Sequence, residues 1–211
     1  MKRLLGTIFL FSVFSSYISS QATVKVDLLK NSWLAIHGTS NILPFKLIQD
    51  GEKLLGKSIT MTATESQNKI YLSQNQLAII VKNFTSENPM ALRDFKKLIK
   101  ADTYPAIKAQ LNYIETSIGN EKDLYSKGNA SVNITIAGVV KQYIIPVSSN
   151  KHGEYVSVVG GKKISIRDFG LEPPTEMMGL IKVSEWVSID FNMICKLTFD
   201  KDSPIVLSQT N

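Results

Sequence analysis

The sequence predicts a mainly β protein, an antiparallel β-barrel or sandwich of about eight strands with one amphipathic helix. Short runs of alternating or β-branched residues follow one another from Trp33 to the region of residue 198. Clusters of glycine, asparagine and serine separate these runs, as tight reversals require. Only the stretch at about 89–100 has helical spacing instead. A sheet of this size must protect its edges, which a closed barrel or a sandwich does.

The N-terminus has the order of a secretory signal. Lys2 and Arg3 precede a mostly apolar stretch, residues 4–18, which is shorter than the roughly 20 residues that a helix needs to cross a bilayer. Small residues at Ser20 and Ala22 predict cleavage after Ala22. We therefore expect a signal peptide at 1–22, one domain at 23–211 and a periplasmic location.

The single cysteine limits what can anchor or staple the mature chain. Cys195 has no partner for an internal disulfide, and it lies far from the position that a lipoprotein anchor requires. No later segment holds 18 consecutive apolar residues, so we expect no integral membrane span. The core and the backbone ladders must then hold the fold together.

The alternation pattern places the strands one after another along the chain. The predicted strands cover residues 32–39, 43–48, 56–64, 69–82, 107–117, 129–137, 139–147, 154–159 with 163–167, and 184–198. Reversals are predicted at 49–51, 137–138, 148–153 and 160–161, which are rich in glycine, asparagine or serine.

The helix is predicted from its start signal and its apolar face. Asn88 can cap free amides, and Pro89 suits the first helical position because it lacks the N–H that would be unpaired there. Leu92, Phe95 and Ile99 recur at helical spacing, so this face should pack against the sheet.

The clearest strands have one apolar face. In 187–197, odd-numbered positions are apolar and most even-numbered positions are polar, and even-numbered positions of 131–136 are apolar in the same way. In a small barrel the apolar face points inward, where it either fills the interior or lines a ligand cavity. The pattern alone leaves both outcomes open.

The residues give no indication of catalysis. The only histidines, His37 and His152, stand in no catalytic or metal-binding motif, so we expect no enzyme, cofactor or metal. The segment Gly160–Lys163 lacks the spacing of a phosphate loop and is interpreted as a hairpin. The net charge of +6 is spread over scattered lysines, which argues against a nucleic-acid partner.

Several segments together resemble the YceI-like family of exported lipid-binding proteins. The most specific piece is the helix exit, where 98–101 and 104–107 give the family's Leu-Lys-Ala and Tyr-Pro-x-Ile pattern as Leu-Ile-Lys-Ala and Tyr-Pro-Ala-Ile. The other matching segments are 33–41 with Phe45, 84–90, 128–136 with 138–139, 167–174, 179–183 and 187–191.

The resemblance implies a lipocalin-like antiparallel barrel that holds a long-chain isoprenoid or other lipid in its apolar interior, without chemistry. The alternative is a structural or interaction module of the cell envelope with a solidly packed barrel. For the first hypothesis, the residues predicted to bind the ligand are Leu111, Tyr113, Val132, Ile134, Ile136, Phe169, Ile189, Phe191 and Met193. The sequence is compatible with a monomer or a homodimer.

Overall fold

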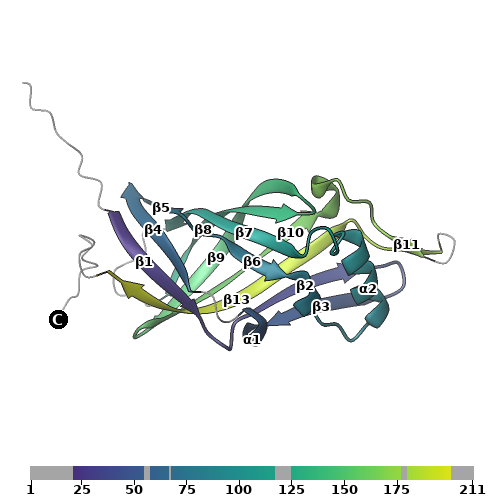
Figure 1. Cartoon of the computed structure of the whole chain (residues 1–211), viewed down its shortest axis with the longest axis horizontal. Helices are drawn as coiled ribbons and strands as arrows, with labels where there is room; N and C mark the ends of the chain where they lie inside the picture. Colours follow the sequence, from purple (N-terminus) through teal and green to yellow (C-terminus); the bar gives the residue numbers. More distant parts are fainter. Residues whose placement is uncertain (1–20, 55–57, 67, 117–124, 177–179, 201–211) are drawn as a thin grey trace, which may run out of the picture.

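The structure is a computed structural model that describes residues 21–200 except 55–57, 67, 117–124 and 177–179 (Figure 1). Residues 1–20 of the predicted signal peptide lie outside the described part of the chain. The boundary expected after Ala22 falls inside the first strand, where Ala22 is 1% exposed.

One large antiparallel sheet forms most of the molecule. Its strands are β1 (Gln21–Leu28), β2 (Trp33–Thr39), β3 (Pro44–Asp50), β4 (Ile59–Ser66), β5 (Lys69–Ser73), β6 (Leu77–Ile80), β7 (Ala106–Thr116), β8 (Tyr125–Ile136), β9 (Val139–His152), β10 (Tyr155–Ser165) and β13 (Trp186–Phe199). The other elements are α1 (Gly51–Leu54), α2 (Pro89–Leu98), the 3-10 turns η1 (Val81–Asn83) and η2 (Ile166–Phe169), and the small pair β11 (Thr175–Glu176) and β12 (Ile181–Lys182).

The sheet closes into a ring. Strands β4, β5, β7, β8, β9, β10 and β13 follow one another from β1, and β13 pairs back with β1. The expected lipocalin-like antiparallel barrel of about eight strands is thereby confirmed. At the end of the barrel that carries α2, β13 pairs with β2 and β7 pairs with β6 instead, and β3 adds to β2 (Figure 1).

Two long strands change partners midway, and a side chain fills each gap. Strand β13 pairs with β2 up to Asn192 and with β1 from Cys195, and between them Ser32 Oγ accepts a hydrogen bond from Ile194 N at 2.9 Å. Strand β7 changes from β6 to β5 in the same way. There Asn75 accepts from Leu111 N at 2.7 Å and donates to Leu111 O at 2.8 Å. Each of these side chains supplies the hydrogen bonds that a neighbouring strand would otherwise make to the backbone at that point.

The strand predictions were wrong at the places where a strand begins or bends. Strand β1 was missed, although Val24 and Val26 alternate with lysine and aspartate. The run predicted at 69–82 is split into β5, β6 and η1, because Gln74 has a φ of 59° and Asn75 turns inward to serve Leu111. Of the predicted strands 56–64 and 107–117, residues 56, 57 and 117 lie outside the described part.

Two predicted reversals are continuous strand. Strand β9 runs through 148–152 and turns only at Gly153, and β10 passes straight through Gly160 and Gly161. These glycines make room for neighbouring side chains. A Cβ at Gly160 would lie 2.6 Å from Phe191 Cζ, and one at Gly161 would lie 2.3 Å from Asp190 Oδ1. The interpretation of 160–163 as a hairpin was therefore wrong.

The predicted helix and its cap are confirmed. Asn88 accepts a hydrogen bond from Ala91 N at 3.1 Å, and Pro89 begins α2. The apolar face packs as expected, with Phe95 edge-on to Phe84 at 5.2 Å between ring centroids. The helix ends at Leu98, two residues before the predicted end, because Lys100 adopts a φ of 54°. Helix α2 lies at one end of the barrel, close to β3 (Figure 1).

Candidate functional site

The barrel encloses a cavity of about 620 Å³. Its wall is made by inward-facing side chains of the ring strands, by β2 and β3, and by the packed face of α2. This volume falls in the ordinary range of small-molecule pockets, roughly 300–1,000 Å³. A solidly packed barrel is thereby excluded.

Eight of the nine residues predicted to bind a ligand line this cavity. They are Leu111, Val132, Ile134, Ile136, Phe169, Ile189, Phe191 and Met193. The alternation of β8 and β13 therefore brings together residues that are far apart in the sequence.

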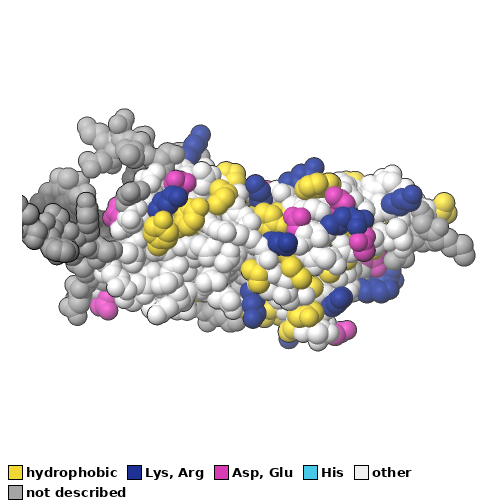
Figure 2. All heavy atoms as spheres, turned by 90° about the horizontal axis from the view of Figure 1, so that it is seen from above, with side chains coloured by type: hydrophobic (Ala, Val, Ile, Leu, Met, Phe, Trp, Pro, Cys, Tyr) yellow, Lys and Arg dark blue, Asp and Glu magenta, His cyan; other side chains and the backbone are white. Residues whose placement is uncertain are grey.

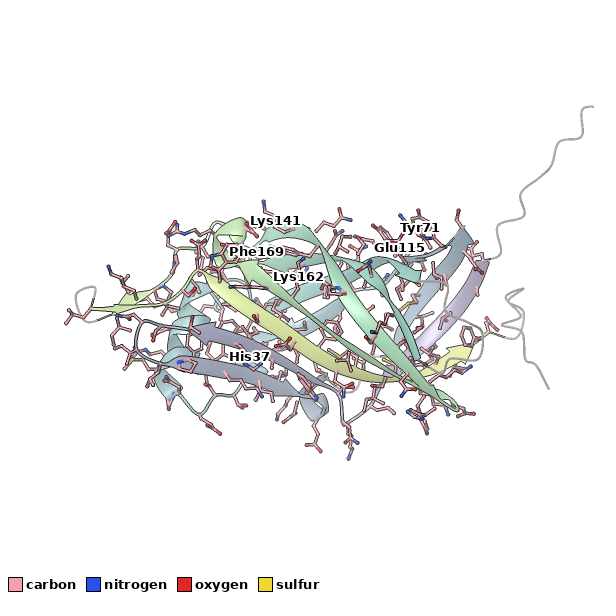
Figure 3. All side chains as sticks on the ribbon, turned by 180° about the vertical axis from the view of Figure 1, so that it is seen from behind. His37, Tyr71, Glu115, Lys141, Lys162 and Phe169 are labelled. Atoms are coloured by element: carbon pink, nitrogen blue, oxygen red, sulfur yellow. The ribbon has the colours of Figure 1, made fainter. Side chains whose placement is uncertain are left out.

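Tyr113 does not line the cavity. A bulge between Leu111 and Tyr113 adds Asn112 to β7, so the side-chain alternation is reversed beyond it and Ile114 faces inward instead. The Tyr113 ring stands 5.7 Å from that of Tyr71, which is 45% exposed. Tyr71 projects from the outside of the barrel in Figure 3. The expectation that Tyr113 faces the interior was wrong.

Sequence reasoning missed the wall that β2, β3 and α2 contribute. Leu34, Ile36 and Phe45 line the cavity, as do Phe95 and Leu98 of α2. The alternation of Leu34 and Ile36, and the helical spacing around Phe95, were visible as core signals. Their position on a cavity could not be predicted, because packed and cavity-lining positions have the same pattern.

The cavity opens between the loop after β2 and the first turn of α2. Four lining residues there are exposed, namely Ile42, Leu43, Asn88 and Met90, and we call them the mouth. The loop is fixed in place. Ser40 Oγ accepts from the backbone N–H of Ile42 and Leu43 at 3.2 and 3.1 Å. Ile42 and Leu43 are thereby held outward, 59% and 63% exposed.

Few of the lining groups are polar. They are Ser40, Asn75, Asn88, Asp94 and Ser184. Both polar atoms of the Asn75 side chain are used by Leu111. Within the part of the chain that the structure describes, no lysine, arginine or histidine contributes to the wall.

The 3-10 turn η2 inserts Phe169 into the barrel. Ser165 Oγ accepts from Arg167 N, Gly170 ends the turn at a φ of 68°, and Phe169 is 2% exposed. The Tyr143 hydroxyl donates to Asp168 Oδ2 at 2.8 Å. Burial and this carboxylate raise the pKa of Tyr143 well above its usual range. Phe169 is therefore a fixed part of the wall.

The ionisable residues that most often carry catalysis do not meet in the cavity. His37 lies on the outer face of β2, with Nε2 3.4 Å from Asp190 Oδ2 (Figure 3). Burial raises the pKa of Cys195, which lines the cavity, to about 11, so its thiol is protonated at neutral pH. No group of three or more potential metal ligands occurs among the described residues.

The outer surface carries mixed charge. Figure 2 shows lysine and arginine side chains interspersed with acidic ones on the face seen from above, without a continuous basic stripe there. Within the described range, no helix is both long and apolar enough to cross a membrane.

The closed antiparallel barrel with an apolar cavity places this protein among the small β-barrels whose interior is large enough to hold a small molecule. The chain belongs to the family of the YceI-like domain, whose sequence profile matches residues 34–195. No curated protein matches the sequence.

Several solved structures are similar to this chain, and two of them superpose well enough to show a shared fold. A polyisoprenoid-binding domain from Saccharophagus degradans, implicated in plant cell wall breakdown, superposes with a TM-score of 0.57 at 14% identity and covers 82% of this chain and 98% of its own. BcnA from Burkholderia cenocepacia has a TM-score of 0.52 at 17% identity, with 77% and 95% covered. At these identities the similarity establishes the fold alone.

Proposed function

We propose that this protein binds a long isoprenoid or a similar amphiphile inside the barrel and carries or stores it without chemical change. The single observation that supports this most strongly is the cavity of about 620 Å³ with an almost entirely apolar wall. Each buried CH₂ group contributes about 0.8 kcal/mol, so a long chain can bind tightly with few polar contacts. The polyisoprenoid-binding relative supports the same ligand class.

The arrangement of the mouth supports entry of a chain at that end. Ile42, Leu43 and Met90 are apolar, exposed and continuous with the cavity wall. A hydrocarbon chain that enters there passes along Phe45 and Leu98 toward the centre of the barrel. The polar lining groups Ser40, Asn88 and Asp94 lie at this end, so the head of the amphiphile is proposed to stay near the mouth.

We further propose that the protein works in the periplasm after export. The basic start and apolar stretch of residues 1–18 support this. Because Ala22 pairs with Ala63 in the sheet, a cut after Ala22 would remove two residues of β1. Fractionation of cells, followed by N-terminal sequencing of the periplasmic form, tests both points. An unprocessed protein in the cytoplasmic fraction would reject this part of the proposal.

A binding titration with a matched pair of variants tests the lipid proposal. Ala130 faces the cavity, and its neighbour Asn129 is exposed on the outer face. Ala130→Trp should lower the affinity of the delipidated protein for a purified polyprenol at least about tenfold, because the indole occupies the path of the chain. Asn129→Trp should bind as the wild type does. Equal affinity in all three proteins would place the ligand outside the cavity.

A second variant guards against misfolding of the first. Ala109 also lines the cavity, and Ala109→Phe adds a smaller ring than tryptophan. Circular dichroism and the urea midpoint identify which variant keeps the barrel. A folded variant that still binds polyprenol at full affinity contradicts the proposal.

A further inference from the structure

Among the described residues that form the cavity wall, Asp94 is the only carboxylate. It lies on α2, and its side chain is 12% exposed, whereas that of the adjacent Arg93 is 64% exposed. The wall that the described residues form holds no lysine, arginine or histidine to face it. A head group on the cavity side of Asp94 therefore meets a carboxylate that is partly removed from water and whose cationic partner, Arg93, is on the solvent side.

Asp94 belongs to the mouth end of the cavity. Met90 and Asp94 are four residues apart on α2 and so lie on the same face of the helix. Ser40 and Ser184 also line the cavity. They lie close together, because Ser184 N donates a hydrogen bond at 2.8 Å to the carbonyl oxygen of Thr39, the residue before Ser40. An amphiphile whose tail fills the apolar interior places its head among these groups.

One oxygen of Asp94 is available to a ligand. Arg93 donates twice to Oδ1, from Nε at 3.2 Å and from Nη2 at 3.1 Å. Among the described residues, both of these hydrogen bonds go to Oδ1 and neither goes to Oδ2. A ligand hydroxyl can donate to Oδ2, whereas a phosphate is mostly deprotonated at neutral pH, so its oxygens act mainly as acceptors and its charge has the same sign as the carboxylate.

We propose that Asp94 selects amphiphiles with a neutral, hydrogen-bond-donating head, such as a polyprenyl alcohol, and rejects the corresponding phosphates. This inference rests on the proposed lipid-binding function. Two negative charges close together outside bulk water repel each other strongly. Phosphate sites in proteins supply cationic side chains or clustered backbone N–H groups, and the wall provides no such cation. Arg93 reduces this repulsion from the solvent side.

The test compares two ligands that differ only in their head. The delipidated protein is titrated with a polyprenol and with its monophosphate of equal chain length, and the ratio of the two dissociation constants is measured. We expect the wild type to prefer the alcohol at least about tenfold. Asp94→Asn should reduce that ratio toward one, and Arg93→Gln should increase it. The control Glu115→Gln, on the outer face beside Lys69, should leave it unchanged.

The outcomes separate this inference from the function it rests on. If the wild type binds both ligands with equal affinity, or if Asp94→Asn keeps the full ratio, the inference fails while lipid binding stands. If the wild type binds neither ligand, the proposed lipid-binding function fails and the selectivity fails with it. Opposite shifts in Asp94→Asn and Arg93→Gln would support the inference, since a general loss of packing would not move the ratio in two directions.

Discussion

Two glycines on the inner face of the barrel leave room for aromatic rings of the cavity wall. A Cβ at Gly38 would lie 2.2 Å from Cζ of Phe45, and one at Gly160 would lie 2.6 Å from Cζ of Phe191. Each ring can therefore lie against the glycine of the neighbouring, paired strand instead of extending across the interior. The volume of the cavity therefore depends on these glycines, which have no side chain, as well as on the apolar residues of the wall.

The variant Gly38→Ala tests this role. The new methyl group must displace the Phe45 ring toward the interior, because the ring atoms are its nearest neighbours. We expect weaker polyprenol binding and a loss of about 1–3 kcal/mol in the free energy of unfolding, measured by titration and by urea denaturation. The control is Gly153→Ala. It strains a residue at a φ of 60° with no atom within 4 Å, and should cost about 1 kcal/mol without changing affinity.

Cys195 provides a second test of the interior. Its raised pKa of about 11, from the ordinary value of 9.0, leaves about a hundredfold less thiolate near pH 8 than an exposed cysteine has. Labelling by a thiol reagent should be slow in the folded protein, become faster as the pH rises toward 11, and be fast in urea. Rapid labelling of the folded protein at pH 8 would contradict the burial of this side chain.

At the scale of elements, the barrel depends on the points where its long strands change partners. Strand β7 passes from β6 to β5 near Leu111, and β13 passes from β2 to β1 near Ile194. Asn75 and Ser32 supply the missing backbone partners there, and both are buried. These two side chains maintain the backbone hydrogen bonding where one set of partner strands is replaced by the other.

Asn75→Ala should therefore be costly. It leaves the N–H and C=O of Leu111 without their partners in a partly buried position, which predicts a loss of about 2–3 kcal/mol in the free energy of unfolding. The control Asn129→Ala, at an exposed position of β8, should stay within about 0.5 kcal/mol of the wild type. Urea denaturation measures both. Equal midpoints would show that Asn75 does not support the exchange of partners.

The same elements show how far the sequence could predict the molecule. The alternation of β8 and β13 and the capped start of α2 are local signals, so the barrel class, the helix and the six cavity residues on these two strands could be predicted from them. The bulge at Asn112 is not a local signal, because it is set by pairing with β8, and so Tyr113 was placed on the wrong face. The prediction of a turn at the glycines of β10 was wrong, because these glycines make room for side chains of β13 and β9, which are distant in the sequence.

For the whole molecule, the central feature is a hollow barrel with one apolar interior. The ring closes through the pairing of β1 with β13, and α2 lies at one end of it (Figure 1). The exposed lining residues place the mouth beside that helix. Under the proposed function, this arrangement would shield a hydrocarbon chain from water on all sides except at its head. The proposed function follows from the shape and chemistry of this interior.

Organic extraction of the purified, natively folded protein, followed by mass spectrometry, tests this most directly. The protein is produced from the full sequence, residues 1–211, in a Gram-negative host and weighed intact before and after extraction. We predict a long-chain isoprenoid or similar amphiphile at about one molecule per chain in the wild type, and its loss from folded Ala130→Trp. A wild-type protein that carries no lipid, and takes up none when offered a polyprenol, would contradict the account.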